Sequence, residues 1–186
     1  FLCTFAPKFI VMLELKDATL TANGRTLIHR LSLMAQDGQM TCVTGAEGCG
    51  KTSLVLAMLG LLPLGEGLVS VDGELMTPLS APVFRRLMAY GPQKRPVTVS
   101  QTEVDTEGLE TVWSPYNRRR TQLTAIDEHL DVAPMAQKRI VIVDDPDVAL
   151  LGTLKSLSNS GHTVVVTSQR EEYLNQSDKI LTLGKE

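Results

Sequence analysis

Apolar and polar residues alternate in two stretches near the beginning of the chain, residues 12–20 and 27–35. This alternation is typical of strands that bury one face. The letters TANGRT between them contain Asn-Gly, a strong signal for a tight turn, so the pattern predicts an N-terminal antiparallel hairpin. A second hairpin is predicted over residues 67–76, with Asp72-Gly73 at its turn.

After the first hairpin, short apolar segments of the length typical of strands alternate with longer ones of the length typical of helices. Strands are predicted over residues 39–45, 139–144, 163–167 and 178–183. Helices are predicted over residues 51–62, 147–159 and 170–175, and residues 84–93 are predicted to run from a short helix into a strand. Because strands and helices alternate, the sequence predicts an α/β fold with a mainly parallel central sheet.

Length and composition are those of one globular domain. The chain has 186 residues, 43% of them apolar, which is enough for a single core over residues 12–186. Residues 94–137 begin as a polar stretch without periodicity and are predicted to form an insertion made of a loop and one short helix over 118–130. Residues 1–11 lack the features of a signal peptide and are interpreted as an N-terminal extension before a candidate start at Met12.

Charge and cysteine content exclude several classes of function. The formal net charge of −3 gives no electrostatic reason to expect binding to nucleic acid. The spacing of Cys3, Cys42 and Cys49 fits neither a disulfide framework nor a zinc site, which indicates a reducing, cytoplasmic setting. No apolar run approaches the ~18–20 residues that span a bilayer. The sequence therefore predicts no direct membrane insertion, and any link to a membrane would pass through a partner.

One motif carries a specific chemical prediction. The letters GAEGCGKTS fit the phosphate-loop pattern G-x-x-x-x-G-K-[ST], between a predicted strand and a predicted helix. Backbone N–H groups of such a loop surround phosphate oxygens, the lysine reaches the terminal phosphates, and the hydroxyl helps to hold Mg²⁺. The predicted nucleotide-binding residues are Gly45, Ala46, Glu47, Gly48, Cys49, Gly50, Lys51, Thr52 and Ser53.

Two adjacent aspartates follow an apolar strand in the stretch VIVDDPDVALL. Two like charges at the end of a buried strand are costly unless a positive group lies opposite. P-loop folds hold Mg²⁺ between the loop hydroxyl and an aspartate in this position, so Asp144 is predicted as a metal ligand together with Thr52. The alternative is that Asp144 is the N-cap of the helix that follows.

Several segments in the right order resemble the ATP-binding cassette family, the nucleotide-binding subunits of ABC transporters. The resemblance runs from Met12 to Gly184 and includes GLVSVDGELM after the phosphate-loop helix, MAYGPQ, and the closing SDKILTLGKE. It implies a P-loop NTPase fold, with ATP and Mg²⁺ as cofactors. It also implies that Gln93 contacts Mg²⁺ and the attacking water, and that the partners are another cassette subunit and a membrane permease.

The chain also departs from the family pattern. No leucine-serine-glycine-glycine-glutamine signature occurs between Gln93 and Ile140, and this interval is short, so the resemblance implies a reduced helical subdomain. Asp145 stands where the family has a catalytic glutamate, and a shorter carboxylate would reach the attacking water poorly. Three further departures are Ala22 for the adenine-stacking aromatic residue, Leu151 for the aspartate that reaches across a dimer, and Ser168 for the switch histidine.

Two functional hypotheses follow, with a third kept open. The first is a cassette subunit that binds MgATP and hydrolyses it weakly, with Asp145 and Gln93 as the catalytic residues. The second is a non-hydrolysing cassette that regulates or braces a complete partner. The third, a small-molecule kinase, has weak support from the arginines at 118–120. For a cassette, the expected location is the cytoplasm, peripheral at the inner face of the membrane through a partner.

Overall fold

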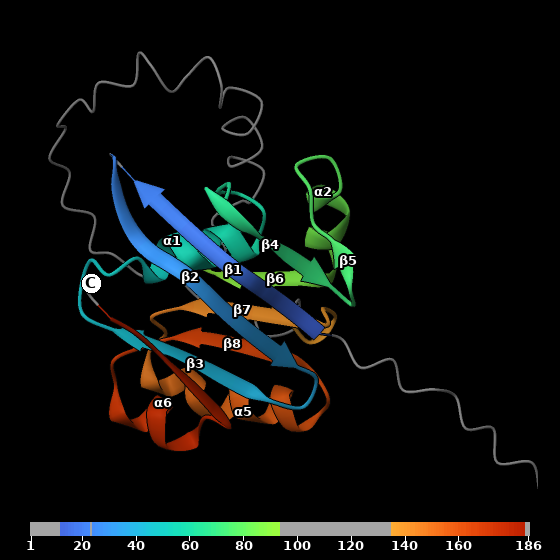
Figure 1. The fold of residues 1–186 in the computed structure, drawn as a ribbon. Coiled ribbons are helices and arrows are strands. Elements are labelled where there is room, and N and C mark those ends of the chain that lie inside the picture. Colours follow the sequence, from blue (N-terminus) through green and yellow to red (C-terminus); the bar gives the residue numbers. More distant parts are fainter. Residues whose placement is uncertain (1–11, 23, 94–134, 185–186) are drawn as a thin grey trace, which may run out of the picture.

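Two sheets form the framework of the protein in the computed structural model, which describes residues 12–22, 24–93 and 135–184 (Figure 1). One sheet is antiparallel, in the order β2 (Arg25–Gln36), β1 (Met12–Ala22), β4 (Glu66–Val71), β5 (Glu74–Leu75). The other is parallel throughout, in the order β6 (Met88–Gly91), β7 (Ile140–Asp144), β8 (Thr163–Thr167), β3 (Met40–Gly45), β9 (Lys179–Leu183). This arrangement confirms the predicted α/β fold with a mainly parallel sheet.

Helices cover the parallel sheet on both faces. Figure 1 shows α1 between the two sheets, whereas α5 and α6 lie on the opposite face of the parallel sheet. The bounds are α1 Lys51–Met58, α2 Ala81–Phe84, η1 Arg85–Leu87, η2 Val148–Leu150, α5 Leu151–Asn159 and α6 Glu171–Gln176. The central strands β7 and β8 are buried along their whole length, which explains why both read as continuous apolar runs rather than as alternating patterns.

The structure corrects the sequence-based prediction at one helix end. The helix predicted over residues 51–62 ends at Met58, with Leu59 as its C-cap. Gly60 follows with a φ of 62°, a left-handed conformation that glycine adopts without strain and that commonly ends a helix. The predicted insertion over 94–137 lies outside the described residues except for 135–137, as does the predicted extension over 1–11.

The two predicted hairpins join into one sheet. Leu13 pairs with Val71 and Leu15 with Val69, so β1 lies between β2 and β4. All four of these side chains are buried against α1 and the parallel sheet. The antiparallel sheet therefore covers the first helix and fixes where the segment between β3 and α1 lies.

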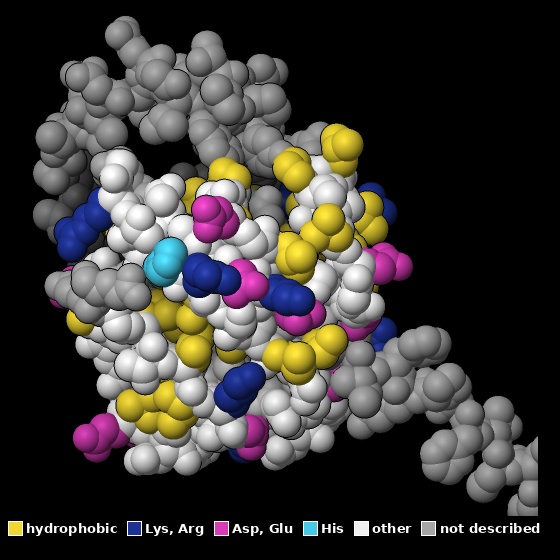
Figure 2. Space-filling view, viewed as in Figure 1, with side chains coloured by type: hydrophobic (Ala, Val, Ile, Leu, Met, Phe, Trp, Pro, Cys, Tyr) yellow, Lys and Arg dark blue, Asp and Glu magenta, His cyan; other side chains and the backbone are white. Residues whose placement is uncertain are grey.

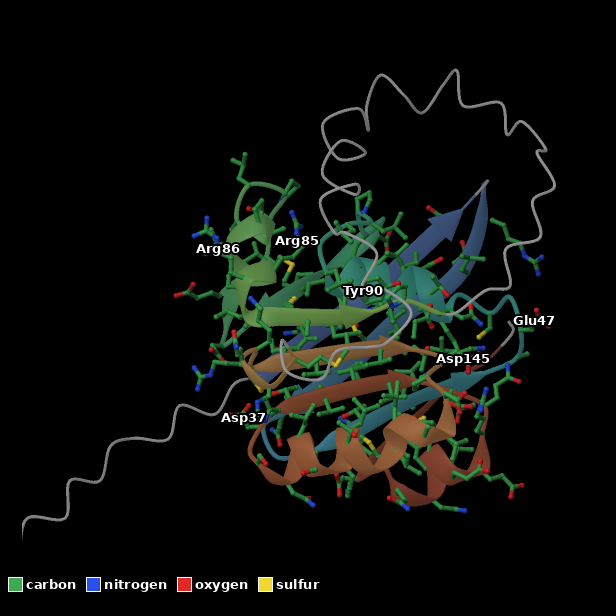
Figure 3. All side chains as sticks on the ribbon, turned by 180° about the vertical axis from the view of Figure 1, so that it is seen from behind. Asp37, Glu47, Arg85, Arg86, Tyr90 and Asp145 are labelled. Atoms are coloured by element: carbon green, nitrogen blue, oxygen red, sulfur yellow. The ribbon has the colours of Figure 1, made fainter. Side chains whose placement is uncertain are left out.

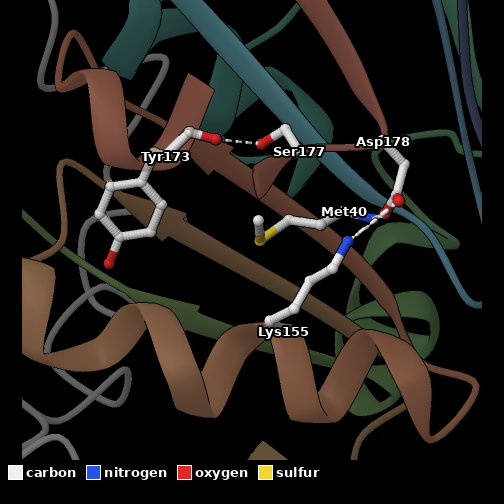
Figure 4. A network of polar contacts seen from close by, with 5 residues as sticks. All are labelled: Met40, Lys155, Tyr173, Ser177 and Asp178. Carbon is white, nitrogen blue, oxygen red and sulfur yellow. Dashed lines mark hydrogen bonds and ion pairs between the residues drawn. The ribbon is translucent and has the colours of Figure 1, made fainter. Parts of the chain in front are cut away.

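A polar network ties the amino-terminal ends of β3 and β9 to α5 (Figure 4). The Asp178 carboxylate accepts a hydrogen bond from the Met40 N–H at 2.8 Å and binds the Lys155 ammonium at 2.9 Å. Ser177 donates to the Tyr173 carbonyl at 2.7 Å. Partial burial of Asp178 opposes its ionisation, but the Met40 N–H and the Lys155 ammonium outweigh this, so the pKa of Asp178 lies below its usual value.

The lowered pKa of Asp178 gives a pH-dependent contribution to stability. A carboxyl group whose pKa is lowered by folding stabilises the protein above its ordinary pKa and loses this effect as the pH falls through the folded-state pKa. We expect Asp178→Asn to lower the free energy of unfolding at pH 7 by about 1 kcal/mol, and the difference from wild type to shrink below about pH 4. Urea titrations at several pH values measure this. Asp17→Asn is the control, since the Asp17 carboxylate forms an exposed ion pair with Arg30 at 4.0 Å; an equal loss there would contradict the assignment.

Apolar side chains gather on the side of the molecule formed by α2 and β5 (Figure 2). Leu79 is 93% exposed and Val83 63% exposed, and Leu75 of β5 adds to the same surface, which we call the α2 patch. None of the helices in the described ranges is long and apolar enough to cross a bilayer.

Candidate functional site

The carboxyl ends of β3, β7 and β8 meet at one edge of the parallel sheet. β3 ends at Gly45 and the chain then turns through residues 46–50 into α1. Gly45 has a φ of 152°, and a Cβ on it would lie 2.7 Å from the Leu183 carbonyl oxygen, so only glycine fits there. This close approach lets the loop fold tightly over the end of β9. Figure 3 shows Glu47 of the loop and Asp145 at this same edge.

Lys51 folds back across the loop that precedes it. Its ammonium donates to the Gly45 carbonyl at 2.6 Å and to the Ala46 carbonyl at 3.0 Å. Gln169, which follows β8, also donates to the Gly45 carbonyl through its side-chain amide, at 2.8 Å. The loop is thus braced from α1 and from β8. A bound phosphate would compete with the two carbonyls for the ammonium.

The other predicted loop residues surround this lysine. Ala46, Glu47 and Gly48 are exposed, so their backbone N–H groups can face a ligand, whereas Cys49 is buried. Ser53 lies in the first turn of α1 and is half-buried. Gly50 is the N-cap of α1 with a φ of 100°, a conformation that L side chains rarely adopt. The predicted segment therefore forms a loop that opens onto a helix N-terminus, the geometry that binds phosphate groups.

Hydroxyl groups from two elements hold the buried Asp144 carboxylate. Thr52 donates to Oδ2 of Asp144 at 2.7 Å, and Thr167 donates to Oδ1. Asp144 is only 2% exposed, so these hydrogen bonds compensate for the loss of water around its carboxylate. Thr167 also accepts a hydrogen bond from the Asp145 N–H at 3.0 Å. One threonine on β8 therefore orients both aspartates.

Asp144 is not the N-cap of the following helix. Asp147 fills that place, because its side chain accepts a hydrogen bond from the Ala149 N–H at 3.3 Å at the start of η2. The N-cap alternative for Asp144 is therefore wrong. What Asp144 contacts instead is the phosphate-loop threonine, as the metal hypothesis requires.

Gln93 and Asp145 lie together. The Gln93 side-chain amide donates to Oδ2 of Asp145 at 3.1 Å. Asp145 has a φ of 46°, in the left-handed region, where Asp and Asn are tolerated better than longer side chains. The structure thus brings Gln93 to the predicted catalytic carboxylate. Its predicted role as a metal ligand stays a prediction.

Ser168 directly follows β8 at this edge of the sheet. Its side chain is fully buried, and its hydroxyl accepts a hydrogen bond from the Arg170 N–H at 3.2 Å. Gln169, the next residue, reaches the loop instead. Sequence reasoning missed Gln169 and Thr167. A signal existed for Thr167, because it is the polar end of the run VVVT, and parallel strands bring their carboxyl ends to one edge.

The donor set at this edge fits Mg²⁺ bound together with a phosphate. The Thr52 hydroxyl and the Asp144 carboxylate are hard oxygen donors, and they lie within one hydrogen bond of each other. The described residues contain no group of three or more His, Cys, Asp or Glu side chains that could hold a metal ion. A magnesium ion here would therefore take most of its ligands from phosphate oxygens and water, as is usual for this metal.

Comparisons with known proteins agree with this geometry. The family model described as "ABC transporter" matches residues 28–150. The cytochrome c biogenesis ATP-binding export protein CcmA of Hahella chejuensis is 26% identical, over 93% of this chain and 96% of that protein. The spermidine/putrescine import ATP-binding protein PotA of Pasteurella multocida is 27% identical over 94% of this chain, but the match spans only 56% of PotA.

Two solved structures show the same fold. An ATP-binding subunit of an ABC transporter superposes with a TM-score of 0.64 and 19% sequence identity, over 92% of this chain and 85% of that chain. A bacterial Atm1-family ABC exporter with ATP bound has the same TM-score of 0.64 and 17% identity, over 93% of this chain and 37% of that chain. At these identities the likeness concerns the fold.

Proposed function

Because the chain belongs to the ABC transporter family, whose model matches residues 28–150, we propose that it binds MgATP in the loop Gly45–Ser53 and hydrolyses it slowly. The observation that carries this proposal is the hydrogen bond between Thr52 and Asp144. It joins the hydroxyl at the end of the loop to the carboxylate at the end of β7, which are 92 residues apart in sequence. The two groups that would share a magnesium ion are therefore adjacent.

Each part of the site has a role in this proposal. The loop N–H groups and the α1 N-terminus bind the phosphates, and Lys51 contacts the terminal ones. Thr52 and Asp144 hold Mg²⁺, which when bound neutralises phosphate charge. Asp145 accepts a proton from the attacking water, and Gln93 orients its carboxylate through the 3.1 Å hydrogen bond.

ATP hydrolysis is expected to be slow because the side chain of Asp145 is one methylene shorter than that of glutamate. When a catalytic group is displaced by about 1 Å, the reaction rate falls about 10²-fold. The second candidate is a non-hydrolysing cassette that braces a complete partner. It is favoured by Ser168, a fully buried serine at the position where the family pattern has the switch histidine.

Partners and transport direction are part of the proposal. We propose a membrane permease as partner and assign its contact to the α2 patch, because contiguous exposed apolar side chains mark interaction surfaces. A second cassette subunit is the other proposed partner. The relatives CcmA and PotA are named for export and import respectively, so the similarity favours neither direction.

The magnesium part of the proposal is tested by Asp144→Asn. We expect wild-type affinity for ATP to be about tenfold higher with Mg²⁺ than with EDTA, and this gain to fall below about twofold in the variant, because the amide cannot supply a charged oxygen ligand. Isothermal titration calorimetry in both buffers measures it. Asp147→Asn is the control, since Asp147 lies in the same segment but caps η2. An unchanged magnesium dependence in Asp144→Asn would contradict the assigned metal role.

A further inference from the structure

A pocket of about 650 Å³ adjoins the phosphate loop, on the side that faces β2 and the end of β9. Glu47, Gly48 and Cys49 of the loop line it, together with residues 25–29 and Leu31 of β2 and residues 182–184. Its volume lies in the range of about 300–1,000 Å³ that holds small ligands. A nucleotide whose phosphates occupy the loop must place its sugar and base next to the loop, and this pocket shares three loop residues with it.

The strand that lines the pocket is irregular at this place. Between the pairs Thr21–Thr26 and Ala18–Leu31, β2 advances five residues while β1 advances three. Arg30, within this stretch, has a φ of 46°. Such bulges redirect side chains and are common beside functional sites. The regular alternation of β2 is therefore interrupted along the pocket wall.

β2 also packs directly against the start of α1. A Cβ on Gly50 would lie 3.2 Å from the Cβ of Leu27, so the strand and the loop–helix junction are in close contact. Leu27, Leu31 and Leu183 give the pocket an apolar floor, whereas Arg25 and Glu47 at its rim are exposed. An apolar floor with a charged rim suits a flat heterocycle that stacks on one face and keeps its edge in water.

We propose that the Arg25 guanidinium lies against the face of the base of the bound nucleotide; this rests on the proposed function, which already places the nucleoside beside the loop. None of the described residues that line the pocket is Phe, Tyr or Trp. Among them, Arg25 supplies the one permanent positive charge, on a planar group that stacks on aromatic faces. Because every base has a π-face, such stacking discriminates weakly between bases. The subsite is therefore expected to bind ATP and GTP with similar affinity.

The test compares a nucleotide with its phosphate chain alone. Binding of MgATP, MgGTP and magnesium tripolyphosphate is measured by calorimetry on the full chain. We expect Arg25→Ala to weaken ATP and GTP binding about fivefold each and to leave tripolyphosphate within about twofold of wild type. Arg25→Tyr restores nucleotide affinity without the charge, whereas Arg25→Lys, which keeps the charge but not the planar group, does not. Arg30→Ala is the matched control, because Arg30 is also exposed on β2 but does not line the pocket.

Four results would overturn the inference. The first is an unchanged ATP affinity in Arg25→Ala, and the second is a loss in Arg25→Ala that tripolyphosphate shares equally. The third is a loss of ATP affinity in His29→Ala but not in Arg25→Ala. Each of these would show that Arg25 does not contact the base, while the phosphate loop would remain the binding site. Wild-type protein that binds neither ATP nor tripolyphosphate would overturn the proposed function itself, and the nucleoside pocket with it. Folding of each variant is verified by its melting temperature.

Discussion

Replacing Lys51 with alanine is expected to lower the affinity for MgATP by about 100-fold or more. The ammonium makes hydrogen bonds to the Gly45 and Ala46 carbonyls, and phosphate oxygens would take over these donors in the complex. Each charge-assisted hydrogen bond contributes about 1.5–3 kcal/mol, so losing two of them exceeds a factor of 100. Calorimetry or a fluorescent ATP analogue measures the change.

Lys179→Ala is the control for this experiment. Lys179 also donates to a backbone carbonyl, that of Met34 at 2.9 Å, but from the beginning of β9, at the opposite end of the parallel sheet from the loop. We expect its affinity for MgATP to equal that of wild type. Retained affinity in Lys51→Ala, with both variants folded, would disprove the phosphate-binding role of the loop.

The second large effect is expected from Asp145→Glu, which should raise the rate of ATP hydrolysis by about 10- to 100-fold. The extra methylene moves the carboxylate about 1 Å toward a water above the γ-phosphate, and displacements of this size change rates about 10²-fold. The left-handed backbone at position 145 opposes this gain, because glutamate adopts a φ of 46° less readily than aspartate. We therefore expect the measured increase to fall short of the upper figure.

Asp145→Asn completes the test. Asparagine also tolerates the left-handed conformation and can still accept the hydrogen bond from Gln93, but it cannot take a proton from water. We expect it to remove the residual turnover while ATP affinity stays within about threefold of wild type. If wild type and Asp145→Glu both bind ATP without turning it over, the non-hydrolysing alternative is the correct one.

Much of the site was predictable because its signals are local. The pattern GAEGCGKTS needs only the preceding strand and the following helix, and both lie where the apolar runs predicted them. Asp144 was predictable because a buried strand that ends in a charged residue requires a compensating partner, which proved to include Thr52. The parallel sheet was predictable for the same reason, because the spacing of apolar residues that distinguishes strands from helices is visible within short segments of the sequence.

What escaped prediction depends on contacts between distant segments. The pairing of β1 with β4, which joins the two hairpins, leaves no mark on either hairpin alone. The bridge from Thr167 to both aspartates requires knowing that β8 lies beside β7. The left-handed backbone of Asp145 is not visible in the sequence, and it offers a conformational reason for aspartate at a position where reach alone favours glutamate.

The Asp178 network has a consequence for how this chain can vary. It fastens the amino-terminal ends of β3 and β9 to α5, whereas the loops that carry the candidate chemistry all leave the sheet at its carboxyl edge. The contacts of Asp178 and the candidate catalytic residues therefore lie at opposite ends of the parallel sheet. Replacing a partly exposed catalytic side chain such as Asp145 leaves the Asp178 network untouched, so a cassette can lose its catalytic chemistry and persist as an ordered component of a larger assembly.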